Sequence, residues 1–121
     1  MDAESIIRDF TDAWGRGDKQ SILDAFTDDA VYHNIPMSPC NGKTEIRTFL
    51  DSFLGVITAS VKFDIKHQLI DGNIVMNERI DTLELEAGPV ALPVCGIFHF
   101  TDDGKISEWR DYFDMGHFTG S

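Results

Sequence analysis

Arg79 and Asp81 lie two residues apart in a strand-like segment, on a face whose other residues are mostly apolar. Buried charges are unfavourable on such a face unless they have partners. Residues 74–85 are rich in branched apolar side chains, which is typical of a β-strand. Side chains alternate between the two faces of a strand, so Arg79 and Asp81 point the same way. Their face also carries apolar residues expected in a core, namely Val75, Leu83 and Leu85. A guanidinium and a carboxyl group on such a face need partners.

A second strand-like segment, residues 109–114, offers a further carboxyl group. Asp111 shares a face with Trp109 and Phe113, so its carboxyl group is also expected to point inward. One guanidinium can bond two carboxyl groups at once. We therefore predict a buried constellation in which Arg79 lies between the two aspartates.

Two carboxyl groups joined by an arginine could perform acid–base chemistry. Close together in an apolar pocket they resist ionising together, so we expect the pair to hold one proton at neutral pH. One carboxyl group can then accept a proton while the other donates one. The same residues could instead form a purely structural ion network, and the pattern alone leaves both interpretations open.

Two polar residues on a short predicted strand, residues 30–34, could bind a water molecule. Tyr32 and Asn34 are two positions apart and share a face, with His33 on the opposite face. A hydroxyl and an amide can both hydrogen-bond water. The structural alternative is a tyrosine at a strand end followed by a turn asparagine.

Helices are expected before and after that short strand. Asp2 can cap a helix that runs to about Trp14, and Asp18 can cap a second, short helix. We predict a turn at residues 27–29. The clearest helix covers residues 43–57, where apolar residues keep helical spacing: Ile46, Phe49, Leu50, Phe53, Leu54 and Ile57.

The rest of the chain predicts an antiparallel sheet. Strand-like segments occur near residues 61–70, 73–85, 91–101 and 105–114, separated by turns at residues 71–73, 86–90 and 102–104. Helices followed by strands indicate an α+β fold. A curled sheet wrapped over helices makes a cone with an open mouth, which is a natural small-molecule site. Candidate lining residues, which could equally be ordinary core, are Phe53, Ile57, Leu83, Leu92, Val94 and Phe113.

Composition narrows the possible partners. The chain has 121 residues, which fits one domain over residues 1–121, and a formal net charge of −11. Nucleic acids and anionic membranes require a basic patch, so we predict neither as a partner. Transmembrane and signal-peptide patterns are not found, and Cys40 and Cys95 are expected to be reduced thiols, so we predict a cytoplasmic protein. The histidines lack metal-ligand spacing, so we predict no metal site.

Several motifs together carry a resemblance to a known family. They are Tyr32-His33-Asn34-Ile35-Pro36, Glu78-Arg79-Ile80-Asp81, Gly104-Lys105-Ile106 and Trp109-Arg110-Asp111-Tyr112-Phe113-Asp114. In this combination the chain resembles limonene-1,2-epoxide hydrolases from the first helix to about Asp114. The resemblance implies the cone fold of nuclear transport factor 2 and ketosteroid isomerase, also called cystatin-like, with a curved, mixed but mostly antiparallel sheet.

The resemblance also implies roles for individual residues. Asp111 matches a general base that takes a proton from water, and Tyr32 and Asn34 match the side chains that hold this water. Asp81 matches the general acid that protonates the epoxide oxygen, and Arg79 matches the bridge. The implied reaction converts a small apolar epoxide, cyclic or terpene-like, to a vicinal diol in one step. It uses no metal or other cofactor.

Three alternatives remain at this point. A ketosteroid isomerase or polyketide cyclase would use an inward aspartate with an oxyanion donor, and it has no need of Arg79 between two aspartates. An epoxide-opening cyclase could use the same aspartates, with a substrate hydroxyl in place of water. A non-catalytic ligand-binding module would be favoured if side chains filled the cavity.

The outer face of the sheet is expected to be partly apolar, with Ile80, Ile97 and Ile106 as candidates. A second copy is the simplest cover for such a face, and a two-fold dimer is the commonest arrangement. The family resemblance also implies a homodimer.

Overall fold

A curved six-stranded sheet with the strand order β2-β1-β6-β5-β4-β3 organises the chain. The computed structural model describes the backbone of residues 1–119, and the side chains of these residues except 56–59 and 118–119. In chain order the elements are α1 (Ala3–Arg16), α2 (Lys19–Asp24), β1 (Phe26–Asn34), β2 (Cys40–Asn41), α3 (Lys43–Val56), β3 (Ile57–Asp71), β4 (Ile74–Leu85), β5 (Gly88–Phe100), β6 (Ile106–Tyr112) and α4 (Gly116–Thr119). Strands β1 and β6 pair in parallel, and the other neighbours pair antiparallel. The predicted α+β fold with a mixed, mostly antiparallel sheet is confirmed.

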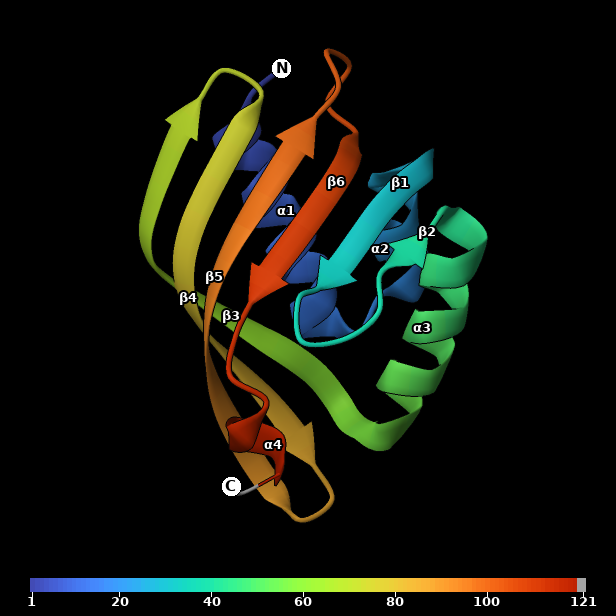
Figure 1. Cartoon of the computed structure of the whole chain (residues 1–121), viewed down its shortest axis with the longest axis vertical. Helices are drawn as coiled ribbons and strands as arrows, with labels where there is room; N and C mark the ends of the chain where they lie inside the picture. Colours follow the sequence, from blue (N-terminus) through green and yellow to red (C-terminus); the bar gives the residue numbers. More distant parts are fainter. Residues whose placement is uncertain (120–121) are drawn as a thin grey trace.

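The helices lie against one side of the sheet. Figure 1 shows α1 behind β5 and β6, while β3 sweeps from the end of α3 to the opposite edge of the sheet. The side chain of Asp2 caps α1 by accepting from the Ser5 backbone N–H at 3.3 Å. The helix ends at Gly17, whose φ of 64° lies in the left-handed region that glycine tolerates. Asp18 caps α2 in the same way, accepting from the Ser21 N–H at 3.1 Å.

Strand β1 begins earlier than predicted, so the predicted turn at residues 27–29 is wrong. These residues belong to β1 because the strand is anchored to β6 on both sides of them, at Phe26 and from Val31 onward, and Phe26 is fixed in the core at 2% exposure. The pairing shifts register between Phe26 and Val31. Asp28 and Asp29 remain exposed inside the strand. Tertiary pairing here overrides the local turn preference of the acidic pair.

The placement of Ile106 on the outer face is also wrong. Ile106 is fully buried, whereas Ile80 and Ile97 are half-buried on the outer face as predicted. The register between β5 and β6 is irregular: His99 faces Glu108, but Phe100 faces Ile106. The irregularity reverses the alternation of β6 and turns Ile106 toward the core.

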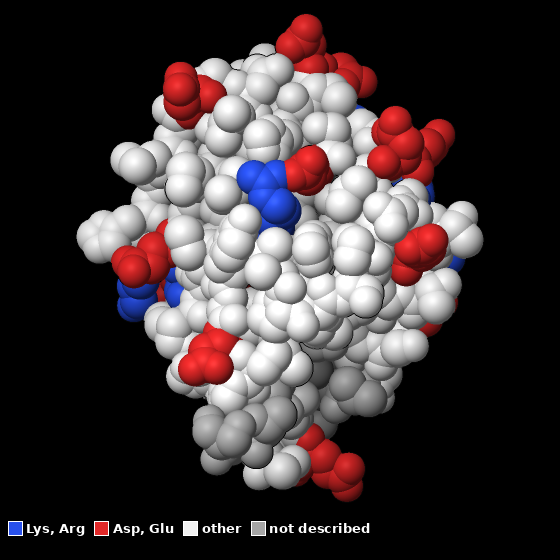
Figure 2. All heavy atoms as spheres, viewed as in Figure 1, with Lys and Arg blue, Asp and Glu red and all other residues white. Residues whose placement is uncertain are grey.

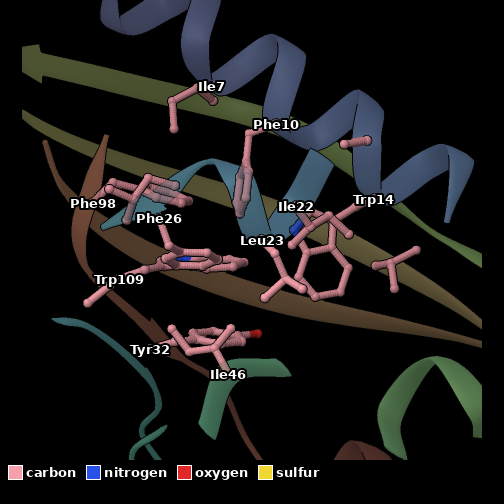
Figure 3. Close-up of a cluster of buried hydrophobic side chains, with 14 of the residues drawn as sticks. Ile7, Phe10, Trp14, Ile22, Leu23, Phe26, Tyr32, Ile46, Phe98 and Trp109 are labelled. Carbon is pink, nitrogen blue, oxygen red and sulfur yellow. The ribbon is translucent and has the colours of Figure 1, made fainter. Parts of the chain in front are cut away.

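An aromatic cluster forms the centre of the core. Figure 3 shows Phe10 of α1 above the Trp109 ring, Tyr32 below it and Trp14 of α1 to one side. The rings of Tyr32 and Trp109 stack with their centroids 4.3 Å apart. Burying a side chain of this size contributes about 3 kcal/mol, so the cluster is a rigid support for whatever lies beside it.

On one face of the molecule, the charged side chains lie mostly toward the edges. Figure 2 views the side of the sheet that faces away from α1, and its centre carries few charged side chains while Asp and Glu gather at the rim. No helix in the described part of the chain is both long and apolar enough to cross a membrane. Cys40 and Cys95 are free thiols, as predicted.

Candidate active site

Arg79 lies at the centre of a buried polar cluster on the inner face of β4. Its side chain is fully buried. Its Nε and Nη2 atoms donate to the two carboxylate oxygens of Asp81, at 3.0 and 2.8 Å. Nη2 also donates to Oδ2 of Asp111 on β6, at 2.8 Å. The predicted constellation of one arginine between two inward aspartates is confirmed.

Gly96 of β5 makes the link between β4 and β6 possible. Arg79 must cross β5 to reach Asp111, and Gly96 is the β5 residue directly opposite Asp111. A Cβ atom at this position would lie 2.5 Å from Oδ1 of Asp111 and closer still to Nη1 of Arg79. Gly96 was not among the predicted site residues. The available signal was a lone glycine inside a strand pattern, because such a glycine often marks a place where another group comes close to the backbone.

Asp111 is held from two sides. The indole N–H of Trp109 donates to its Oδ1 at 2.6 Å, and Arg79 donates to its Oδ2. Strand alternation predicted only that Trp109 points inward with Asp111. The structure makes it both core and a hydrogen-bond donor to the site.

The surroundings shift the pKa values of the buried groups. Burial raises the pKa of Asp111 to about 6, although Arg79 and the Trp109 hydrogen bond oppose this rise. Burial alone would lower the pKa of Arg79, but the Asp111 and Asp81 carboxylates reverse the effect and raise it. The guanidinium therefore stays charged, and its carbon also lies 4.8 Å from the centre of the Phe63 ring.

Tyr32 and Asn34 reach the same place from β1. The parallel pairing sets Tyr32 beside Trp109 and Asn34 beside Asp111. The Tyr32 hydroxyl donates to Oδ1 of Asn34 at 3.4 Å. Burial, and then the Asp111 charge, raise the pKa of Tyr32 well above its usual value, so the hydroxyl keeps its proton. Their predicted common face is confirmed.

A cavity of about 390 Å³ opens beside these groups. Its polar lining includes Tyr32, Asn34, Asp81 and Asp111, and its walls are otherwise apolar. Of the predicted lining residues, the structure places Phe53, Leu83, Leu92, Val94 and Phe113 at the cavity. The side chain of Ile57 lies outside the described residues. An unfilled cavity removes the condition that would have favoured the non-catalytic module.

Further walls were not predicted as pocket residues. Trp14, Phe49 and Phe63 line the cavity, together with Met37 and Met115. The helical spacing of Trp14 and Phe49 marked them as apolar face residues but could not separate core from cavity wall, because both patterns look alike in sequence. Among the side chains that the structure describes, no group of three or more His, Cys, Asp or Glu residues could hold a metal ion.

Sequence comparison finds relatives over most of the chain. The family model of the limonene-1,2-epoxide hydrolase catalytic domain matches residues 1–119. Epoxide hydrolase EphG of Mycobacterium tuberculosis (strain ATCC 25618 / H37Rv) is 36% identical over 107 residues, which are 88% of this chain and 69% of EphG.

Comparison with solved structures also finds an epoxide hydrolase. An LEH-like epoxide hydrolase of M. tuberculosis has a TM-score of 0.83 at 34% identity, covering 98% of this chain and 87% of its own. A protein from Shewanella denitrificans OS-217 assigned as a SnoaL-like polyketide cyclase has a TM-score of 0.85 at 16% identity, with coverages of 98% and 94%. A hypothetical protein with a ketosteroid isomerase-like fold from Catenulispora acidiphila DSM 44928 has a TM-score of 0.80 at 18% identity, with coverages of 93% and 87%. The last two share the fold alone.

Proposed function

The chain belongs to the limonene-1,2-epoxide hydrolase family, and on this premise we propose that it adds water to a small apolar epoxide in one step. It is an epoxide hydrolase, a hydrolase that acts on an ether bond. The proposed product is a vicinal diol. One observation carries the proposed mechanism: a buried arginine bonds two carboxyl groups, and both groups line an apolar cavity.

Asp111 is the proposed general base. Tyr32 and Asn34 hold a water molecule beside it, and the water oxygen attacks an epoxide carbon as Asp111 takes one of its protons. A carboxyl group with a pKa of about 6 is ionised at neutral pH and remains basic enough to accept this proton. The position of Asn34 next to Asp111 in the β1–β6 pairing supports this role.

Asp81 is the proposed general acid. As the carbon–oxygen bond of the epoxide breaks, the proton of the Asp81 carboxyl group passes to the departing oxygen. The site then holds a protonated Asp111 and an ionised Asp81, so Asp111 must lose a proton and Asp81 must gain one before the next turnover. Arg79 contacts both groups and keeps their separation fixed through this cycle.

The cavity walls favour an apolar substrate. Among the described residues at the cavity, Asp81 and Asp111 are the ionisable carboxyl groups, and the remaining walls are mostly aliphatic, aromatic or methionine side chains. A charged or strongly polar substituent would lose its hydration there without gaining a partner. We propose a cyclic or terpene-like epoxide.

Single-turnover hydrolysis in ¹⁸O-labelled water tests the one-step mechanism. With enzyme in excess over a terpene-like epoxide, we expect label in the first diol formed, because water attacks directly. Attack by a carboxylate would instead deliver unlabelled protein oxygen to that first diol and would make Asp111 or Asp81 a nucleophile. Preformed diol in the same labelled water serves as the control for exchange.

Two other activities fit this site less well. A ketosteroid isomerase or polyketide cyclase has no use for an arginine shared by two carboxyl groups, and the neighbours of those classes share the fold alone. An epoxide-opening cyclase would use the same aspartates, with a substrate hydroxyl as the nucleophile. Tyr32 and Asn34 beside Asp111 favour water as the nucleophile.

We also propose a setting for the enzyme. A single domain over residues 1–121 works in the cytoplasm without a metal or other cofactor. The free thiols of Cys40 and Cys95 suit a reducing compartment, and a net charge of −11 disfavours nucleic acid as a partner.

A homodimer through the outer face of the sheet is the proposed assembly. Leu69 and Met76 face each other across β3 and β4 and are 74% and 41% exposed, and Ile97 continues this apolar row on β5. Light scattering should give twice the chain mass of 13.6 kDa at micromolar concentration. A charge in the row, Met76→Lys, should shift the protein toward monomer, and a monomeric wild type would remove the proposal.

A further inference from the structure

We propose that Asn77, itself held by Gln68, is a positioning residue that fixes the rotation of the Arg79 guanidinium. The inference rests on the proposed roles of Arg79 and the two aspartates, and it adds a support that lies outside the cavity. Neither Asn77 nor Gln68 is among the described residues that line the cavity.

These residues form a row across the sheet. Gln68 on β3 faces Asn77 on β4, Asn77 faces Gly96 on β5, and Gly96 faces Asp111 on β6. Asn77 is buried, with 2% exposure, and Gln68 is half-buried. Polar side chains thus extend from the far edge of the inner face to the proposed base, with the Arg79 guanidinium lying over the glycine in the middle.

Asn77 occupies the end of the guanidinium that the aspartates leave free. Nε and Nη2 are used by Asp81 and Asp111, and Nη1 donates to Oδ1 of Asn77 at 2.8 Å. Asp111 is reached through Nη2 alone, so a small rotation of the guanidinium would break that contact. A bond at Nη1 opposes this rotation and also satisfies a donor that is buried away from water.

Gln68 decides which way the Asn77 amide points. The Nδ2 atom of Asn77 donates to Oε1 of Gln68 at 3.2 Å, which leaves Oδ1 directed at Arg79. The reverse orientation would place an amide NH₂ against a guanidinium, with donors facing donors. The Gln68 carbonyl therefore selects the productive orientation of Asn77.

The amide of Asn77 also has the advantage of being an uncharged acceptor. A carboxylate at residue 77 would bond Nη1 equally well, but it would add a negative charge to a site that already holds Asp81 and Asp111. Extra negative charge favours the protonated form of a nearby carboxyl group. Asn77 thus completes the contacts of Arg79 without raising the pKa of the base further.

The test compares two changes at residue 77. Asn77→Leu removes the acceptor, and we expect kcat to fall about tenfold to a hundredfold while KM stays within about twofold of wild type. Asn77→Asp keeps the acceptor, so at high pH its kcat should be much closer to the wild-type value than the kcat of Asn77→Leu. Its acid limb in kcat/KM should move up by about one pH unit.

Two substitutions of Gln68 provide a matched pair of variants. Gln68→Glu keeps an oxygen that accepts from Asn77, whereas Gln68→Leu does not, so only the leucine variant should lose kcat. Glu78→Gln is the control, since Glu78 neighbours Asn77 on β4 but has an exposed side chain on the outer face. Circular dichroism and thermal unfolding verify that each variant is folded.

A readout independent of turnover separates this proposal from the proposed function. The carboxyl ¹³C resonance of Asp111, assigned by its loss in Asp111→Asn, should titrate at higher pH in Asn77→Asp than in wild type. Unchanged titration in Asn77→Asp, or wild-type kcat in a folded Asn77→Leu protein, would overturn the role of Asn77. Absence of diol with the wild-type enzyme would instead overturn the proposed function, whatever the titration shows.

Discussion

Asp111→Asn should lower kcat by about a hundredfold to ten-thousandfold, the usual contribution of a general base. The amide keeps the shape of the carboxyl group and can still accept from Trp109 or Arg79, but it cannot take a proton from water. Binding of an unreactive epoxide analogue should persist, because the apolar walls are unchanged. Stopped-flow or steady-state diol formation measures the loss, and Asp64→Asn, on an exposed aspartate of β3, is the control.

The pH profile makes this prediction specific to the base. Since Asp111 must be ionised to act and its pKa is raised to about 6 by burial, wild-type kcat/KM should fall as pH drops through about 6. The residual activity of Asp111→Asn should lack this limb. A wild-type profile that stays level between about pH 7 and 5 would contradict Asp111 as the base.

The two aspartates should also behave as one unit. Asp81→Asn cannot deliver a proton to the departing oxygen, so we expect a loss of similar size. The double variant should be little worse than either single variant, because the reaction needs both groups. Losses that multiply in the double variant would show that the two groups act independently.

Arg79→Lys should reduce activity by at least about a hundredfold although the charge is retained. An ammonium group has no planar fork and cannot bond Asp81 through two nitrogens while also reaching Asp111 across β5. The free energy of unfolding should fall as well, because two buried carboxyl groups lose their shared partner.

Steady-state kinetics and thermal unfolding of Arg79→Lys check both effects. Arg110→Lys is the matched control: Arg110 is the neighbour of Asp111 on β6, but its side chain pairs with Glu108. Near-normal turnover by a folded Arg79→Lys protein would mean that the arginine does not hold the aspartates in their working positions.

Much of the candidate site follows from local rules that a sequence displays. Strand alternation alone predicted that Arg79 and Asp81 point inward from one strand and that Asp111 points inward from another. In the structure Arg79 donates hydrogen bonds to both aspartates. The same alternation placed Tyr32 and Asn34 together. These predictions succeed because the direction of a side chain on a regular strand depends only on its own strand.

Predictions failed where the outcome depended on a remote partner. The acidic residues at 28 and 29 suggested a turn, but pairing with β6 keeps them in β1. Strict alternation put Ile106 outside, but a register irregularity against β5 turns it inward. Local propensity is a weak preference, and a well-buried pairing elsewhere in the chain can outweigh it.

By itself, the sequence determined the family motifs, the α+β class and the inward direction of the charged residues. Only the tertiary structure decided that β1 runs parallel to β6, which brings Asn34 beside Asp111. It also decided that Gly96 leaves room for Arg79 to cross β5, and that Asn77 and Gln68 support its far end. The physical reason is that these contacts join residues on different strands, so they depend on strand order and register, which the periodicity of a single strand does not contain.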